Sequence, residues 1–283
     1  ANTTGTQNTA IGDRALRYNT TASNNTAVGT SALTANTTGH SNVALGVEAL
    51  DANTTATYNT GLGFRTLSDN TTGASNVAVG AGALKTNTTA SNNTAVGYDA
   101  LFANTTGDGN VAVGVQALGA NTTSAGNTAL GYGAARTTTT GASNTAVGYL
   151  SLKQNTTGHS NVSVGFTALQ ENTTGANNTS VGFQSGLANT TGSSNTSLGH
   201  NSLISNTTAS LNTAVGRSAL QANTTGAENT ATGYNSQLST TTGNYNTSNG
   251  SGSLAVNTTG SSNVAIGLNA LVANTTASNN TAV

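Results

Sequence analysis

The chain repeats itself every 17 residues, and this period constrains its fold more than any other feature. Asn8 recurs at that spacing as far as Asn280, seventeen times in all, without an insertion or a deletion. Counted from this Asn as column 1, the commonest repeat reads N-T-A-V-G-x-x-A-L-x-x-N-T-T-G-x-x. A fixed period of this kind is typical of a tandem array in which each repeat stacks on its neighbours.

Residue types favour β-coils over helical repeats. Thr and Val are frequent, Pro is absent, and small residues gather in two turn zones of each repeat. Helical repeats need longer units, of about 33 residues or more. The sequence therefore predicts an all-β fold, a parallel β-solenoid (β-roll or β-helix) with one repeat per coil. We expect a short strand over columns 1–4 and a second strand over columns 11–14.

The array is predicted to occupy the whole chain, residues 1–283, as a single uncapped domain. Dividing 283 residues by 17 gives about 16.6 coils. Because both ends fall in mid-repeat and neither carries the polar cap of a free solenoid, we interpret the chain as a window of a longer protein.

The columns differ in the residues that they accept. Column 5 is Gly in all sixteen copies, which predicts a turn with positive φ or a close approach of neighbouring backbone. Column 4 is Val, Ile or Leu with two exceptions and column 9 is Leu with three, so both are assigned to the core. Every charged residue lies in columns 6, 7, 10, 11, 16 or 17, which we expect to be hydrated. Column 3 is Ala, Ser or Gly and should face away from column 4, leaving a flat face for packing with another chain.

Composition argues against several functional classes. Only 5% of residues are charged and the net charge is -1, so no basic surface is available for nucleic acid. No run approaches the roughly 20 apolar residues of a membrane span. Cys is absent, and the three His and the few acidic residues lie in variable columns where burial cannot tune them. We therefore expect no enzyme activity, no metal, no cofactor and no membrane insertion of this segment.

Column 12 is one candidate site. Its Asn precedes two Thr and so matches the acceptor pattern for N-glycans, but stacked Asn would equally form an amide ladder along the array. Both interpretations stay open for the fifteen column-12 residues Asn2, Asn19, Asn36, Asn53, Asn70, Asn87, Asn104, Asn121, Asn155, Asn172, Asn189, Asn206, Asn223, Asn257 and Asn274.

Column 6 is the other candidate site, because it holds seven of the eleven aromatic residues. Such rings either shield a corner and pack against a neighbouring chain, or offer a stacking surface to sugars. The candidate ligand-facing residues are Phe64, Tyr98, Tyr132, Tyr149, Phe166, Phe183 and Tyr234.

Four segments resemble the N-S-V-A-I-G motif of YadA-like trimeric autotransporter heads: Ser41–Gly46, Ser75–Gly80, Ser160–Gly165 and Ser262–Gly267. The resemblance implies a left-handed parallel β-roll in each of three chains, packed about a threefold axis at a bacterial surface, with adhesion as the activity. The N-T-A-V-G and N-T-T-G arrays are also similar to parts of phage tail fibres and large secreted bacterial repeat proteins.

Our leading hypothesis is a structural extracellular fibre or adhesin shaft without chemistry, located at a cell surface or in a virion tail fibre. Its expected partners are copies of itself, as a homotrimer or filament, and cell-surface glycans. One alternative is an ice-binding β-solenoid that uses a Thr ladder from columns 13 and 14. Another is a carbohydrate-binding module that uses the aromatic column.

Overall fold

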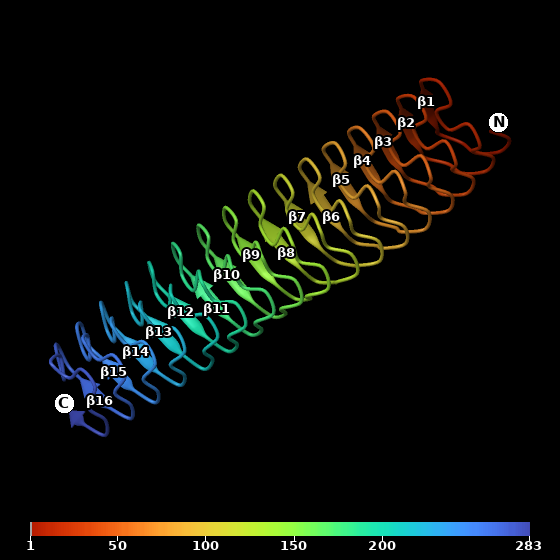
Figure 1. The fold of residues 1–283 in the computed structure, drawn as a ribbon. Coiled ribbons are helices and arrows are strands. Elements are labelled where there is room, and N and C mark those ends of the chain that lie inside the picture. Colours follow the sequence, from red (N-terminus) through yellow and green to blue (C-terminus); the bar gives the residue numbers. More distant parts are fainter. Residues whose placement is uncertain (1) are drawn as a thin grey trace. The chain divides into compact units, whose positions relative to one another are not determined.

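The computed structural model describes residues 2–283 and confirms the predicted fold class. The chain is a parallel β-solenoid of about 16 turns with a spacing of 17 residues, and the described residues contain no helix (Figure 1). It divides into two compact units, one reaching Ala142 and the other beginning at Ser143, and each unit is described by itself.

Each coil contributes one short strand, formed by columns 2–4. The strands of the first unit are β1 (Thr9–Ile11), β2 (Thr26–Val28), β3 (Val43–Leu45), β4 (Thr60–Leu62), β5 (Val77–Val79), β6 (Thr94–Val96), β7 (Val111–Val113) and β8 (Thr128–Leu130). Those of the second unit are β9 (Thr145–Val147), β10 (Val162–Val164), β11 (Thr179–Val181), β12 (Thr196–Leu198), β13 (Thr213–Val215), β14 (Thr230–Thr232), β15 (Thr247–Asn249), β16 (Val264–Ile266) and β17 (Thr281–Ala282).

Within each unit, successive strands pair in parallel with a register of one repeat. Thr94 of β6 lies opposite Val111 of β7, for example, and Ala95 lies opposite Ala112. The pairing continues outside the strands, because the Leu33 amide donates to the Ala49 carbonyl at 3.0 Å. Neighbouring coils are thus hydrogen-bonded along much of their contour, which satisfies backbone groups that a coil could not pair alone.

The predicted second strand over columns 11–14 is wrong. Column 11 belongs to a turn, and the two Thr of columns 13 and 14 form a bend. The reason is visible at Thr37 and Thr38, whose amides both donate to the single carbonyl of Thr54, at 2.9 and 3.2 Å. A β-ladder would use alternate residues for pairing with one neighbour, whereas here two consecutive amides converge on one acceptor.

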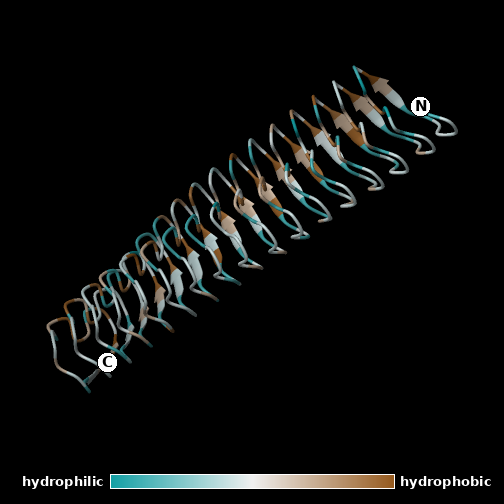
Figure 2. Cartoon of the chain, turned by 45° about the vertical axis from the view of Figure 1, so that its right-hand side comes forward, coloured by the Kyte–Doolittle hydropathy of each residue, from teal (hydrophilic) through white to brown (hydrophobic). Residues whose placement is uncertain are grey.

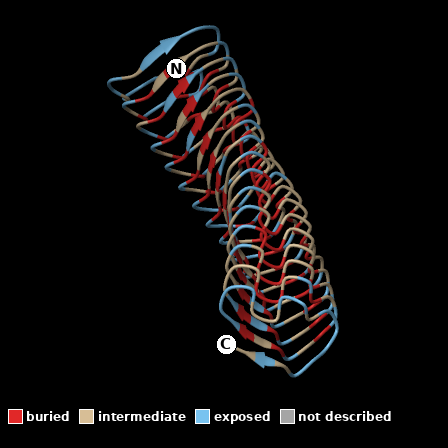
Figure 3. Ribbon diagram, turned by 90° about the vertical axis from the view of Figure 1, so that its left-hand side faces the viewer, coloured by how far each residue is buried: buried red, intermediate tan, exposed pale blue. Residues whose placement is uncertain are grey.

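The assignment of column 4 to the core is also wrong, and so is the idea of an outer small-residue face. Column 3 points inward, with Ala27, Ala95 and Ala214 at 0% exposure, while column 4 points outward, with Leu45 at 43%. Figure 3 shows the buried strand centres in red between exposed or intermediate ends. Because adjacent strand residues face opposite sides, only one of the two columns can enter the coil, and its narrow interior admits Ala or Ser.

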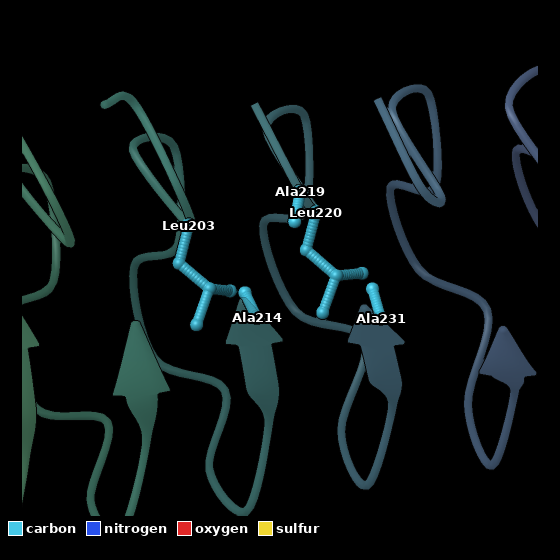
Figure 4. Close-up of a cluster of buried hydrophobic side chains, with 5 residues drawn as sticks. All are labelled: Leu203, Ala214, Ala219, Leu220 and Ala231. Atoms are coloured by element: carbon cyan, nitrogen blue, oxygen red, sulfur yellow. The ribbon is translucent and has the colours of Figure 1, made fainter. Parts of the chain in front are cut away.

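Column 9 supplies the large apolar side chain of each coil, as predicted. Leu220 packs among Ala214, Ala219 and Ala231, which come from columns 3 and 8 (Figure 4). One Leu and two small residues per coil make a thin apolar core. Buried polar ladders therefore have to fill the rest of the interior.

Gly in column 5 has positive φ, as predicted; Gly97, for example, has a φ of 135°. The coil also places columns 7, 9 and 17 in the left-handed region, which the residue types in these columns did not predict. In one part of the first unit these are Asn92, Asp99 and Leu101, with φ of 61°, 51° and 50°. These three left-handed positions, which most coils fill with residues other than Gly, add to the column-5 Gly and explain how 17 residues close so tight a loop.

Candidate functional site

The column-12 Asn side chains lie inside the coils and form a ladder. In the first unit, each amide from Asn19 to Asn121 donates through Nδ2 to Oδ1 of the Asn one coil earlier, at 2.8 to 3.1 Å. The second unit repeats this from Asn172 to Asn223, at 2.8 to 3.0 Å. Asn2 is exposed and Asn274 is half-buried, whereas the column-12 Asn from Asn19 to Asn257 are buried.

A second amide ladder runs along column 1 and meets the first one. Asn25 and Asn36, from columns 1 and 12, both donate through Nδ2 to the carbonyl of Gly39, at 2.9 Å each. The backbone amide of Asn42 donates in turn to Asn25 Oδ1 at 3.0 Å. A glycan on a buried column-12 nitrogen would replace one of these N–H groups and would need space that the interior does not have. The ladder thus accounts for the N-T-T pattern without a modification.

In the second unit, the column-12 ladder is interrupted at Thr240, which is fully buried. Within residues 2–283, neither Thr240 Oγ1 nor Oδ1 of the preceding Asn223 has a hydrogen-bond partner. On the following side, Asn257 Nδ2 donates to the Gly260 carbonyl at 2.9 Å. The ladder therefore has a defect at this coil.

Restoring the ladder with Thr240→Asn should stabilise the protein. The new amide would donate to Asn223 Oδ1 and accept from Asn257 Nδ2, so the free energy of unfolding should rise by about 1–3 kcal/mol. Urea unfolding of the full chain measures the change. Thr242→Asn, at an exposed position of the same coil, is the control and should leave the midpoint unchanged. A lower midpoint for Thr240→Asn would contradict the ladder as a source of stability.

The two Thr columns have different environments. Column 13 is half-buried, and its hydroxyls donate to the carbonyl of the next coil, as Thr105 Oγ1 does to Thr122 O at 3.0 Å. Column 14 is exposed, as at Thr106. The pair therefore offers one outer rank of Thr, which weakens the ice-binding hypothesis based on these columns.

The column-6 rings point outward and stack on one another in the second unit. Tyr149, Phe166, Phe183 and His200 follow each other with ring centroids 5.0 to 5.3 Å apart and interplanar angles of 6° to 12°. Each inner ring thus has its faces covered by its neighbours and presents its edge to solvent. Because sugars stack on ring faces, this column is a poor platform for them.

The other column-6 candidates are also exposed. Phe64 is 51% exposed with the Arg65 guanidinium 5.1 Å from its ring centroid, and Tyr98 is 56% exposed. Tyr234 is 50% exposed and lies 5.8 Å from the guanidinium carbon of Arg217, and Tyr132 is 48% exposed. Three of the predicted residues, Tyr149, Phe166 and Phe183, are thus brought together in the ring stack of the second unit.

One carboxyl group in a variable column is partly buried. The pKa of Asp51 is raised to about 6, chiefly by burial and to a smaller extent by the neighbouring carboxylates of Glu48 and Asp69, while a backbone hydrogen bond opposes the rise. Glu48 also pairs with Arg65, whose Nε lies 2.5 Å from Glu48 Oε2.

Among residues 2–283, no group of three or more His, Cys, Asp or Glu side chains could hold a metal ion. The described part of the chain likewise has no helix suited by length and hydropathy to cross a membrane.

Two surface depressions in the first unit were not foreseen from the sequence. The larger, of about 330 Å³, is lined by Asp99, Phe102, Gln116, Gly119, Ala120, Arg136 and Thr137. The smaller, of about 150 Å³, is lined by Phe64, Arg65, Ala81, Gly82, Lys85, Tyr98, Asp99 and Phe102. Each depression forms where one coil has a small residue in a variable column and the coils before and after it have larger residues in the same column. The signal that could have revealed the larger depression was Gly119 in column 10, between Phe102 and Arg136, and for the smaller one it was Gly82 in column 7, between Arg65 and Asp99.

No protein-family model matches the chain, and a search of curated proteins finds no significant match. The chain is therefore characterised by its architecture, a parallel β-solenoid built from 17-residue coils.

Proposed function

We propose that the chain is a structural segment of an extracellular fibre or adhesin shaft, at a cell surface or in a virion tail fibre. The observation that carries this proposal is that, within each unit, successive repeats form the same coil and are joined by backbone bonds and, at most coils, by buried amide ladders. A stack of this kind can be lengthened by whole coils without changing its contacts, which suits a spacer. The resemblance to autotransporter heads and tail fibres supports the same function.

The partner that we propose is another copy of the chain, docked on the strand face formed by the outward side chains of columns 2 and 4. This face exposes apolar side chains such as Val43, Leu45 and Leu62, at 41% to 43%. Figure 2 shows brown strands recurring from coil to coil. The face replaces the column-3 surface that the sequence suggested, since column 3 is buried.

Charge also favours a second copy as the occupant of the strand face. None of the charged residues lies in column 2 or column 4, so two such faces can approach without repulsion. On each copy, the outward side chains of the strand face recur once per coil, at the spacing between neighbouring strands. The side chains of two copies can therefore align in register. Repeated apolar surface of this kind is uncommon on proteins that remain monomeric.

The native mass of the full chain tests this proposal. We expect a multiple of the 27.6 kDa chain mass, threefold if the autotransporter resemblance extends to assembly. The double variant Val79→Lys, Val113→Lys places two charges on the strand face of the first unit and should reduce the mass to that of one chain. Circular dichroism checks that the coils remain folded.

The matched control puts the same charges on the same two coils but outside the strand face. Thr89 and Thr123 of column 14 are exposed, so Thr89→Lys, Thr123→Lys should leave the assembly intact. A wild-type chain that is monomeric at all concentrations would contradict self-association, and so would equal dissociation by the two double variants.

A further inference from the structure

We propose that the larger depression of the first unit binds a single pyranose ring of a glycan. We call it the Gly119 slot and define it by Phe102, Gly119 and Arg136 of column 10, with Asp99 and Gln116 of column 7 at its rim. This site differs from the column-6 ring stack and uses none of the residues on the strand face.

The width of the slot follows from the stacking of the coils. Rings that follow each other in column 6 lie 5.0 to 5.3 Å apart, so each coil has room for one ring thickness. Phe102 and Arg136 belong to coils two apart, and the coil between them carries Gly119. The gap is therefore about two strand spacings, roughly 10 Å, which leaves space for one ring between the two side chains.

Phe102 has one face available to a ligand. Lys85 of the preceding coil lies over the ring, with Nζ 5.3 Å from the centroid. On the opposite side the following coil has Gly119, which contributes no side chain. This arrangement contrasts with the column-6 stack, where both faces of each inner ring are covered.

The glycine is not required by the backbone. Gly119 does not have a left-handed φ, and a Cβ atom added there would lie 3.2 Å from the Gln116 carbonyl oxygen and 3.7 Å from that of Asp99. In all the remaining coils, column 10 is occupied by a residue with a side chain, such as Leu187 or Leu238. The slot thus exists because a side chain is missing where the coil would accept one.

The polar groups around the slot favour a sugar over an aromatic ligand. Asp99 supplies a carboxylate that accepts hydrogen bonds, Gln116 an amide that donates and accepts, and Arg136 a guanidinium with five donors. Asp99 and Gln116 are half-buried and Arg136 is exposed. A pyranose can place its C–H face on Phe102 and its hydroxyls on these three groups. A volume of about 330 Å³ is at the lower end for small-molecule sites.

Saturation-transfer NMR on the full chain tests the proposal, with methyl glucoside, methyl galactoside, methyl mannoside and methyl glucuronide as probes. We expect at least one of them to bind with a dissociation constant on the order of 1 mM, as for a ligand of this size in an open site. Phe102→Ala should weaken binding at least tenfold, because it removes the stacking face.

Gly119→Leu is the variant that separates the slot from general destabilisation, since it fills the slot with a residue that column 10 already carries. It should abolish binding while the circular dichroism spectrum stays unchanged. Ala255→Leu, in the same column of the second unit, is the control and should bind like the wild type. Absence of signal from all four probes, or binding that survives Gly119→Leu, would overturn the proposal. The native mass of Gly119→Leu should equal that of the wild type, so failure here is distinguishable from failure of self-association.

Discussion

Gly97→Ala should destabilise the protein by at least about 3 kcal/mol, although it adds only one methyl group. Gly97 has a φ of 135°, a conformation that residues with a Cβ rarely adopt. The new Cβ would also lie 2.6 Å from the Gly114 carbonyl oxygen of the next coil. Gly97 is also bound to the preceding coil, because its amide donates a hydrogen bond to the Val79 carbonyl. Any backbone shift that relieves the clash with Gly114 therefore disturbs the pairing between coils. Denaturant unfolding of the full chain measures the loss.

Gly109 provides the matched control for this substitution, because it is a glycine with positive φ that has open space around it. Its φ is 65°, and a Cβ added there would meet nothing within 4 Å. The same column carries Asn24 and Asn92 with φ of 62° and 61°. Gly109→Asn should therefore change the free energy of unfolding by less than about 0.5 kcal/mol. If Gly97→Ala were as mild as Gly109→Asn, close contact between coils at column 5 would not limit stability.

The fold was predictable because the period, the invariant Gly and the small turn residues all point to one stacked coil. The strand face was not, because a three-residue strand is too short for alternation to say which face is inside. Val in column 4 suggests burial by hydropathy, but the interior is only wide enough for the Ala of column 3 beside the Leu of column 9. The narrowness comes from the left-handed residues at columns 7, 9 and 17. Leu101 at a φ of 50° shows why they were missed, since Leu carries no sequence signal for that conformation.

The candidate sites were predictable in part for a different reason. Column statistics reveal what all coils share, so they located the Asn ladder and the aromatic column. They could not reveal whether neighbouring rings cover one another, which depends on ring orientation along the stack. The Gly119 slot was missed because it exists once, where one coil departs from its neighbours, and averaging over repeats hides such a departure.

Asn104→Ala should destabilise the coil stack by about 2–4 kcal/mol, because it breaks the column-12 ladder at a fully buried position. Asn104 Nδ2 donates to Asn87 Oδ1 at 3.0 Å, and Asn104 Oδ1 accepts from Asn121 Nδ2 at 2.8 Å. Removing the Asn104 amide deprives Asn87 Oδ1 of a donor and Asn121 Nδ2 of an acceptor, and it leaves a small cavity. The effect should be local, since each coil interacts chiefly with its immediate neighbours.

Native-state hydrogen exchange can measure this locality. The amides of Thr88 and Thr105 donate to the carbonyls of the next coils at 3.1 and 2.8 Å, so both should lose protection in Asn104→Ala, while the distant amide of Thr37 should keep it. Thr106→Ala is the control within the same coil, because Thr106 is exposed and lies outside the ladder. Unchanged protection at Thr88 and Thr105 would mean that the amide ladder adds little to stability. Uniform loss along the chain would mean that the coils unfold as one unit and not by nearest neighbours, so the two results decide both the strength of the ladder and its range.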